Sequence, residues 1–322
     1  MLRVRAKLVG LLVVVAALAA GCGGEANPFG GGGGGGSIGE DYDLSGQELT
    51  VGSKEFTEQE ILGQITLQSL EAAGATVEDQ IGLTGSTTVR DSLTSGEVDL
   101  YWEYVGTAWI SYLGETGDIP GDNDFQTVAE RDLEENNVKW FAPANFENSY
   151  AIATNQETAE EYDLQTLSDL GRVIEENPDV ATMCGGSEFL GRDDGLPGVE
   201  EAYGWQFPDE QVTQVQDSIV YSAVDEGQDC NFGSVFTTDG RIQNLDLVVL
   251  EDDQEFFPSY TGAMTARQEV FQENEQLADL FAPIAEELTT EQMQELNAQV
   301  DVEERFPDEV AEEWLQENGF IG

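Results

Sequence analysis

Apolar residues between positions 49 and 101 switch repeatedly between strand-like runs and the spacing of an amphipathic helix. Thr57 and Glu60 have the spacing of a capping box, which marks the start of the first helix. The order strand, helix, strand, helix, strand builds a parallel sheet with ligand sites at its strand ends. The predicted elements are a strand at 49–51, a helix lined by Ile61, Leu62, Ile65 and Leu70, a strand at 77–83, a helix carrying Val89 and Leu93, and a strand at 98–101.

A second series of alternating strands and helices begins near residue 150, and the C-terminal part is helical. Two α/β units with extra tail helices predict a fold of two lobes joined by crossing strands. The predicted elements are a strand at 150–153, a helix at 164–174, a strand at 180–183, helices from Leu196 and Ile219, strands around 234–236 and 245–250, a helix capped by Thr289 and Gln292, and a last helix from Pro307 to Gly319.

The first residues have the pattern of a secretion signal. Arg3, Arg5 and Lys7 precede an apolar run at 8–20, and small residues then lead to Cys22. The run is too short to span a bilayer comfortably. We expect Cys22 to be lipidated and to become the new N-terminus, although a soluble secreted protein cut nearby would share most of this pattern.

An uninterrupted glycine tract occupies residues 30–36. Such a tract cannot bury apolar area, so we expect a flexible tether and a folded part that starts near Leu49. The tract is not a phosphate-binding loop, because no Gly-Lys-Ser/Thr sequence closes it before a helix.

The charge balance is strongly acidic, with 12 basic and 65 acidic residues. Loss of the signal leaves 9 basic residues and a net charge of −56. Apolar content is ordinary, so the pattern indicates a globular protein adapted to high salt. Nucleic-acid binding is excluded because the chain has no basic patch to contact phosphates. A cation-storing acidic protein would need calcium-loop spacing, which the acidic residues lack.

The sequence GSKEFTEQ at 52–59 places Lys54 where a strand turns into a helix. Free backbone N–H groups and an ammonium group at a helix entrance favour an anion site. A surface lysine at a turn is the alternative interpretation. Lys54 and Lys139 are the lysines left after signal cleavage, which favours a specific role for Lys54.

Aromatic residues gather around the third strand, at 96–109. We assign Tyr101, Trp102 and Trp109 to the core, because aromatic residues within strands are usually packed. Tyr104 and Thr107 lie where the chain leaves the sheet, so we expect them to face a cleft.

A third cluster, at 188–204 and 235–242, carries Arg192, Phe236 and Asp239. Its carboxylates do not predict an acid–base pair, because chance proximity explains such pairs in so acidic a chain. The chain has no histidine, no plausible activated nucleophile and no metal-ligand cluster. We therefore expect no catalytic residues, no metal and no cofactor. Cys184 and Cys230 are predicted to form a disulfide outside the cell, with two free thiols as the alternative.

Six ordered motifs carry a resemblance to a known family: GSKEFTEQ, GSTTVRDSLTSGEVDLYWEYVGT, GRDDGLPG, TTDGRI, VLEDDQEFFPSY and ELNAQVDVE. Together they resemble the ProX-type osmoprotectant-binding proteins of ABC importers, which take up glycine betaine, choline, proline betaine or carnitine. The resemblance covers residues 49–321. It implies a type II periplasmic-binding-protein fold, in which two α/β lobes close on a ligand about a hinge of two crossing strands.

The resemblance also implies which residues bind the ligand. Phe236 stands where some members have tyrosine, so the ring is kept and a hydroxyl is lost. The implied residues are an aromatic box of Tyr104, Tyr150, Phe236 and Tyr260 around a trimethylammonium group, and polar contacts from Lys54, Thr107, Asn148 and Arg192.

Ring faces attract a quaternary ammonium group, which cannot donate hydrogen bonds. Choline has no carboxylate and would leave Lys54 and Arg192 largely unused, so we expect a betaine-like zwitterion. Choline, carnitine and a histidine-type betaine remain alternatives, as does a sensor that binds the same ligand but signals through a partner.

The expected organisation follows from these assignments. We expect a monomer on the outer face of the cell membrane, held by its lipid and serving an ABC permease and its ATPase. The expected boundaries are a signal peptide at 1–21, a lipidated cysteine and tether at 22–48, a first lobe at 49–147 plus 251–322, and a second lobe at 148–250.

Overall fold

The computed structural model describes residues 36–322, so the predicted signal, Cys22 and nearly all of the glycine tract lie outside the described residues. The folded part begins earlier than Leu49. Helix α1 (Ser37–Asp41) buries Ile38, and Leu44 is buried after it. The backbone N–H of Ile38 donates to the carbonyl of Phe320 at 3.0 Å. The expected tether boundary at residue 48 is therefore wrong, because residues 36–44 pack against the body of the protein.

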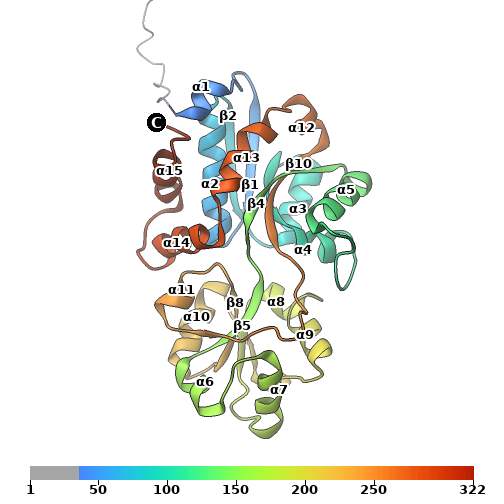
Figure 1. Ribbon diagram of the computed structural model, residues 1–322, viewed down its shortest axis with the longest axis vertical. Coiled ribbons are helices and arrows are strands. Elements are labelled where there is room, and N and C mark those ends of the chain that lie inside the picture. Colours follow the sequence, from blue (N-terminus) through green and yellow to red (C-terminus); the bar gives the residue numbers. More distant parts are fainter. Residues whose placement is uncertain (1–35) are drawn as a thin grey trace, which may run out of the picture. The chain divides into compact units, whose positions relative to one another are not determined.

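The first lobe contains a five-stranded sheet in the order β2-β1-β3-β10-β4 (Figure 1). Strand β1 is parallel to both of its neighbours, β2 and β3, whereas β10 is antiparallel to both β3 and β4. Its elements are α1, β1 (Glu48–Lys54), α2 (Thr57–Ala72), β2 (Thr76–Leu83), α3 (Ser86–Ser95), β3 (Leu100–Tyr104), α4 (Val105–Thr107), a π-helical turn (Ala108–Tyr112), α5 (Asp124–Asn136), β4 (Val138–Glu147), β10 (Thr261–Arg267), α12 (Gln268–Glu273), α13 (Leu277–Glu287), α14 (Thr290–Asp301) and α15 (Pro307–Glu317).

The second lobe contains a second five-stranded sheet, in the order β7-β6-β8-β5-β9. The chain leaves the first sheet at Glu147, enters the second at Tyr150, and returns between Val249 and Thr261. The elements of this lobe are β5 (Tyr150–Thr154), α6 (Gln156–Tyr162), α7 (Leu167–Glu176), β6 (Met183–Gly185), α8 (Ser187–Gly191), α9 (Leu196–Tyr203), a 3₁₀ turn (Asp209–Gln211), β7 (Val212–Gln214), α10 (Asp217–Glu226), β8 (Phe232–Phe236), α11 (Arg241–Asn244) and β9 (Val248–Val249).

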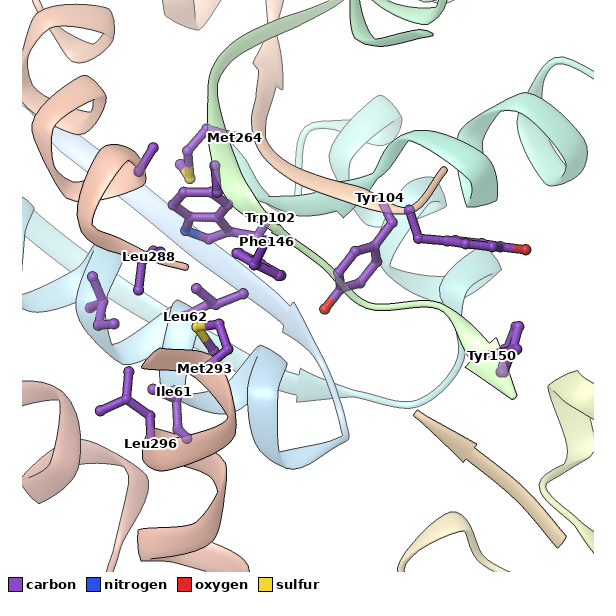
Figure 2. Close-up of a cluster of buried hydrophobic side chains, with 14 of the residues drawn as sticks. Ile61, Leu62, Trp102, Tyr104, Phe146, Tyr150, Met264, Leu288, Met293 and Leu296 are labelled. Atoms are coloured by element: carbon purple, nitrogen blue, oxygen red, sulfur yellow. The ribbon is translucent and has the colours of Figure 1, made fainter. Parts of the chain in front are cut away.

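Strand β3 is buried at every residue, because it lies in the middle of its sheet with helices on both faces. Tyr101 and Trp102 point to opposite faces and join different core clusters. Trp102 pairs with Met264 on the neighbouring strand, and Figure 2 shows the Trp102 ring between Met264 and Phe146. The core assignment of Tyr101, Trp102 and Trp109 is confirmed.

The first long helix has the predicted apolar face, and Ile61, Leu62, Ile65 and Leu70 are all buried. The predicted capping box at its start is wrong. Phe56 occupies the N-cap position and makes no side-chain capping bond. The Thr57 hydroxyl instead donates to Asp301 at 2.7 Å. The predicted cap at Thr289 is present, because its hydroxyl accepts from the Gln292 backbone N–H.

Several predicted boundaries move by a few residues. The third strand runs from Leu100 to Tyr104 instead of 98–101, and the strand expected at 180–183 lies at Met183–Gly185. The helix expected at 164–174 begins at Leu167, where Thr166 provides the cap. Within residues 36–322, no helix is both long enough and apolar enough to cross a lipid bilayer.

Candidate ligand-binding cleft

Strand ends deliver the four predicted box residues to one place between the two sheets. Tyr104 is the last residue of β3, Tyr150 the first of β5 and Phe236 the last of β8. Tyr150 and Phe236 are register partners on adjacent antiparallel strands, and their ring centroids lie 5.2 Å apart. Tyr260 comes directly before β10, with its ring 6.1 Å from that of Tyr150. The structure therefore brings all four rings together.

A fifth ring, that of Phe56, completes the group. It stacks on Phe236 at 5.1 Å with an interplanar angle of 13°, and it lies 6.2 Å from Tyr104. Phe56 comes from the first lobe and Phe236 from the second, so the pair spans the cleft. Sequence reasoning missed Phe56, although it stands two residues after Lys54 in the motif that was singled out.

Gly106 allows the close approach of one of these rings. A Cβ atom at this position would lie 2.8 Å from the Ser259 carbonyl oxygen and 2.9 Å from the Tyr260 ring. Any side chain here would displace Tyr260 from the cleft wall. Gly106 directly precedes Thr107, which is also buried at the cleft.

Lys54 lies at the end of β1 and is buried beside the rings. Its ammonium group contacts Glu103 Oε1 at 2.5 Å and lies 5.0 Å from the centroid of the Tyr104 ring. Glu103 is fully buried and also accepts hydrogen bonds from the hydroxyls of Tyr101 and Tyr112. The charge of Lys54 is thus balanced by a carboxylate of the chain itself.

Arg192 lies on the opposite wall, at the end of α8, and is also paired. Its Nε and Nη2 atoms contact the two oxygens of the buried Asp194 at 2.7 and 2.5 Å, and its Nη1 donates to Glu188 at 3.1 Å. The guanidinium also contacts Thr107 Oγ1 at 3.4 Å and lies 5.7 Å from the Tyr150 ring centroid. Tyr260 donates its hydroxyl to the same Asp194, at 2.6 Å.

A buried carboxylate that sequence reasoning missed holds the base of the cleft. Glu58, on α2, accepts hydrogen bonds from the Tyr104 hydroxyl at 2.6 Å and from Asn148 Nδ2 at 2.8 Å. Asn297 on α14 donates to its other oxygen at 3.3 Å and also donates to the Thr238 carbonyl in the second lobe. Burial raises the pKa of Glu58, and burial together with Glu58 raises the pKa of the Tyr104 hydroxyl.

Two cavities meet along this cleft. The inner one, of about 50 Å³, is lined by the five rings together with Lys54, Thr107, Asn148 and Arg192. The outer one, of about 790 Å³, contains Glu58, Glu60, Asp239 and Arg241. The residues that line both cavities form a neck between them: Glu55, Phe56, Asn148, Ser187, Asp217 and Phe236.

Direct contacts join the lobes on both sides of the rings. Glu188 of the second lobe accepts hydrogen bonds from the backbone N–H and the hydroxyl of Ser86, at 2.6 and 2.9 Å. On the other side, Arg241 of the second lobe lies 3.4 Å from Asp301 of α14. These contacts connect the two walls of the cleft directly.

Cys184 and Cys230 are joined as a disulfide in the second lobe, with their Cα atoms 5.6 Å apart. Cys184 lies on β6, and Cys230 precedes β8. The bridge therefore links the segments on either side of α10, which carries Asp217. Among residues 36–322, no three His, Cys, Asp or Glu side chains form a group suited to a metal ion.

Comparison with known proteins identifies relatives of this chain. The chain is 38% identical over 280 residues to a glycine-betaine-binding protein of Pseudomonas aeruginosa, covering 85% of this chain and 89% of that one. It is 32% identical over 277 residues to the glycine betaine-binding protein YehZ of Escherichia coli, covering 84% and 90%.

A crystal structure described as a glycine betaine/carnitine/choline ABC transporter matches with a TM-score of 0.68 and 25% identity, over 85% of this chain and 98% of that one. The predicted two-lobed periplasmic-binding fold is thereby confirmed. Residues 47–317 match the family model of the substrate binding domain of ABC-type glycine betaine transport systems. The chain belongs to this family of substrate-binding domains.

Proposed function

We propose that this protein captures a quaternary-ammonium osmoprotectant, glycine betaine or a close analogue, and delivers it to an ABC importer. The observation that carries the proposal is the group of five aromatic rings, supplied by both lobes, around one small cavity. A ligand in this cavity would contact both lobes at once. Its binding would therefore favour the closed arrangement over an open one.

The rings suit a cation that cannot donate hydrogen bonds. Each ring face attracts such a cation by roughly 0.5–2 kcal/mol, depending on how far water is excluded. Five rings together could contribute several kcal/mol, whereas micromolar binding needs about 8 kcal/mol in total. Polar contacts and the exclusion of water on closure would supply the remainder. No step of this function requires bond making or breaking, so we propose binding without catalysis.

The names of the relatives from Pseudomonas and Escherichia favour glycine betaine as the ligand. The expected preference for a zwitterion over choline rested on Lys54 and Arg192 being free to hold a carboxylate. Both side chains already face carboxylates of the chain. Their presence alone therefore does not separate glycine betaine from choline, and both belong in the first binding experiment with carnitine and a histidine-type betaine.

The proposed cellular setting follows the sequence pattern. Cys22 would carry the lipid that holds the protein on the outer face of the membrane, and the protein would act as a monomer beside its permease and ATPase. A sensor that binds the same ligand is the second candidate. A receptor kinase that responds to the ligand-bound protein would support the sensor, whereas ligand uptake through a permease would support the importer.

Calorimetric titration tests the ligand class. The mature protein in high salt should release or absorb heat with at least one of glycine betaine, choline, carnitine and proline betaine. The absence of heat with all four would overturn the proposal. Replacing Tyr104 and Tyr260 together by alanine should abolish binding, whereas Phe306→Ala should not, because Phe306 lies outside the cleft and is 67% exposed. Equal affinities for the two variants would show that the rings do not form the site.

A further inference from the structure

Asp217, the first residue of α10, stands at the neck between the inner and outer cavities. The stacked rings of Phe56 and Phe236 line the same neck. A cation held against these rings would therefore lie near the Asp217 carboxylate. This residue was not among the predicted ligand contacts.

Most charged side chains of the inner cavity have partners. Lys54 pairs with Glu103, and Arg192 pairs with Asp194 and Glu188. Glu55, which also lines the neck, accepts a hydrogen bond from the Gly85 backbone N–H at 3.0 Å. In the outer cavity, Arg241 pairs with Asp239 and Asp301. Asp217 differs from the carboxylates of these ion pairs: within residues 36–322 it forms no salt bridge, and no side chain donates a hydrogen bond to it.

The backbone holds Asp217 in this position. A Cβ atom on Gly186 would lie 2.0 Å from Asp217 Oδ1, so the absence of a side chain at Gly186 lets the carboxylate pack against the start of α8. Burial, with the negative charges of Glu55 and Glu188, raises the pKa of Asp217 to about 6. The free protein thus keeps an unfavourable negative charge beside an aromatic cavity, and a bound cation would relieve this cost.

We propose that Asp217 is a specificity-determining residue, which supplies the counter-charge for the ligand's ammonium group and favours cationic over zwitterionic ligands. This inference rests on the proposed function and extends it to the net charge of the ligand. Choline carries only the positive charge. Glycine betaine also carries a carboxylate, which Asp217 repels, so attraction and repulsion partly cancel.

Choline and glycine betaine are nearly the same size, and they differ in the group at the end opposite the ammonium. The ratio of their affinities therefore isolates the effect of charge from the effect of ring contact. Asp217→Asn keeps the shape of the side chain and removes its charge. Asp225→Asn is a matched control, because Asp225 lies on the same helix and is exposed to solvent away from the cleft.

The experiment is calorimetric titration of the mature wild-type protein and both variants with choline and with glycine betaine, at pH 8 and one ionic strength. We expect Asp217→Asn to weaken choline binding about tenfold and to change glycine betaine binding less than threefold, since a nearby charge in a partly dry site acts on the full cation. Asp225→Asn should leave the ratio of the two affinities within twofold of the wild type.

The outcomes separate this inference from the proposed function. If the wild type binds either ligand and Asp217→Asn leaves the affinity ratio unchanged, the counter-charge role is wrong and the proposed function stands. A ratio that shifts equally in Asp225→Asn also overturns the role, because the effect would then come from overall charge. If the wild type binds no quaternary-ammonium ligand, the proposed function fails and this inference fails with it.

Discussion

Replacing Asp217 by asparagine should make the ligand-free protein more stable at neutral pH. Burial and the negative charges of Glu55 and Glu188 raise the pKa of Asp217 to about 6, and the positive charge of Arg241 offsets only part of this increase. The folded protein therefore holds this proton more tightly than the unfolded chain does. Its stability must fall as pH rises from about 4 to about 6, where the folded state binds more protons than the unfolded state. Asparagine does not ionise, so the stability of the Asp217→Asn protein does not fall with pH for this reason.

The size of the effect follows from the pKa of Asp217. An increase from 3.8 to about 6 corresponds to roughly 3 kcal/mol, at about 1.4 kcal/mol for each pKa unit. The carboxylate is partly exposed at the cleft, and solvent screening reduces its interactions. We therefore expect Asp217→Asn to raise the free energy of unfolding by about 1–2 kcal/mol at pH 7 to 8, where the wild-type carboxylate is ionised. Near pH 3.5 the difference should become small, because the wild-type side chain is then mostly protonated in both states.

Urea denaturation of both proteins at several pH values and constant ionic strength measures this difference. The control is again Asp225→Asn, which removes one negative charge from the same helix outside the cleft. Its effect estimates the general relief of repulsion in a chain of net charge −53. A gain at pH 7 no larger than that of the control would refute the reasoning, and so would a gain that persists unchanged at pH 3.5.

Three further changes test other parts of the structure. Phe56→Leu keeps an apolar side chain but removes a ring face, so the ligand affinity measured by calorimetry should fall about 3- to 30-fold. The control Phe306→Leu changes an exposed ring and should leave ligand affinity unchanged. Tyr104→Phe keeps the ring and removes the hydroxyl that donates to the buried Glu58 carboxylate. The free energy of unfolding should fall by about 1–3 kcal/mol, and ligand affinity should fall less than tenfold. A loss of binding free energy larger than the loss of unfolding free energy would contradict this expectation. Replacing Cys184 and Cys230 by alanine removes a cross-link between residues separated by 46 positions in the sequence. The free energy of unfolding measured with urea should fall by about 2–4 kcal/mol. An unchanged denaturation midpoint would show that the disulfide adds no stability.

The sequence predicted the fold well where a local pattern determines local structure. The apolar face of α2 and the cap at Thr289 depend on residues close together in the chain, and both are present. The capping box at Thr57 failed because the hydroxyl of that residue is taken by Asp301, far away in the sequence. The start of the fold was missed for a similar reason. Ile38 is an isolated apolar residue in a polar stretch, and its burial depends on the chain around Phe320 at the opposite end.

The same distinction between local and distant contacts applies to the candidate site. Tyr104, Tyr150, Phe236 and Tyr260 were found through motifs, and the strand ends bring them together. Glu58 had no local signal, because one glutamate among 65 acidic residues is distinguished only by contacts from other elements. The pairing of Lys54 with Glu103 was equally hidden, since 49 residues separate the two side chains in the sequence.

The register between β5 and β8 places Tyr150 opposite Phe236. A slip of one residue would turn the side chains of the shifted strand to the other face of the sheet. The backbone hydrogen bonds between these two short strands therefore fix the positions of the two rings. The long segment that connects these strands can then change in length or sequence at its surface turns without moving either ring. The spacing of the two rings is thereby independent of the length and sequence of those surface turns.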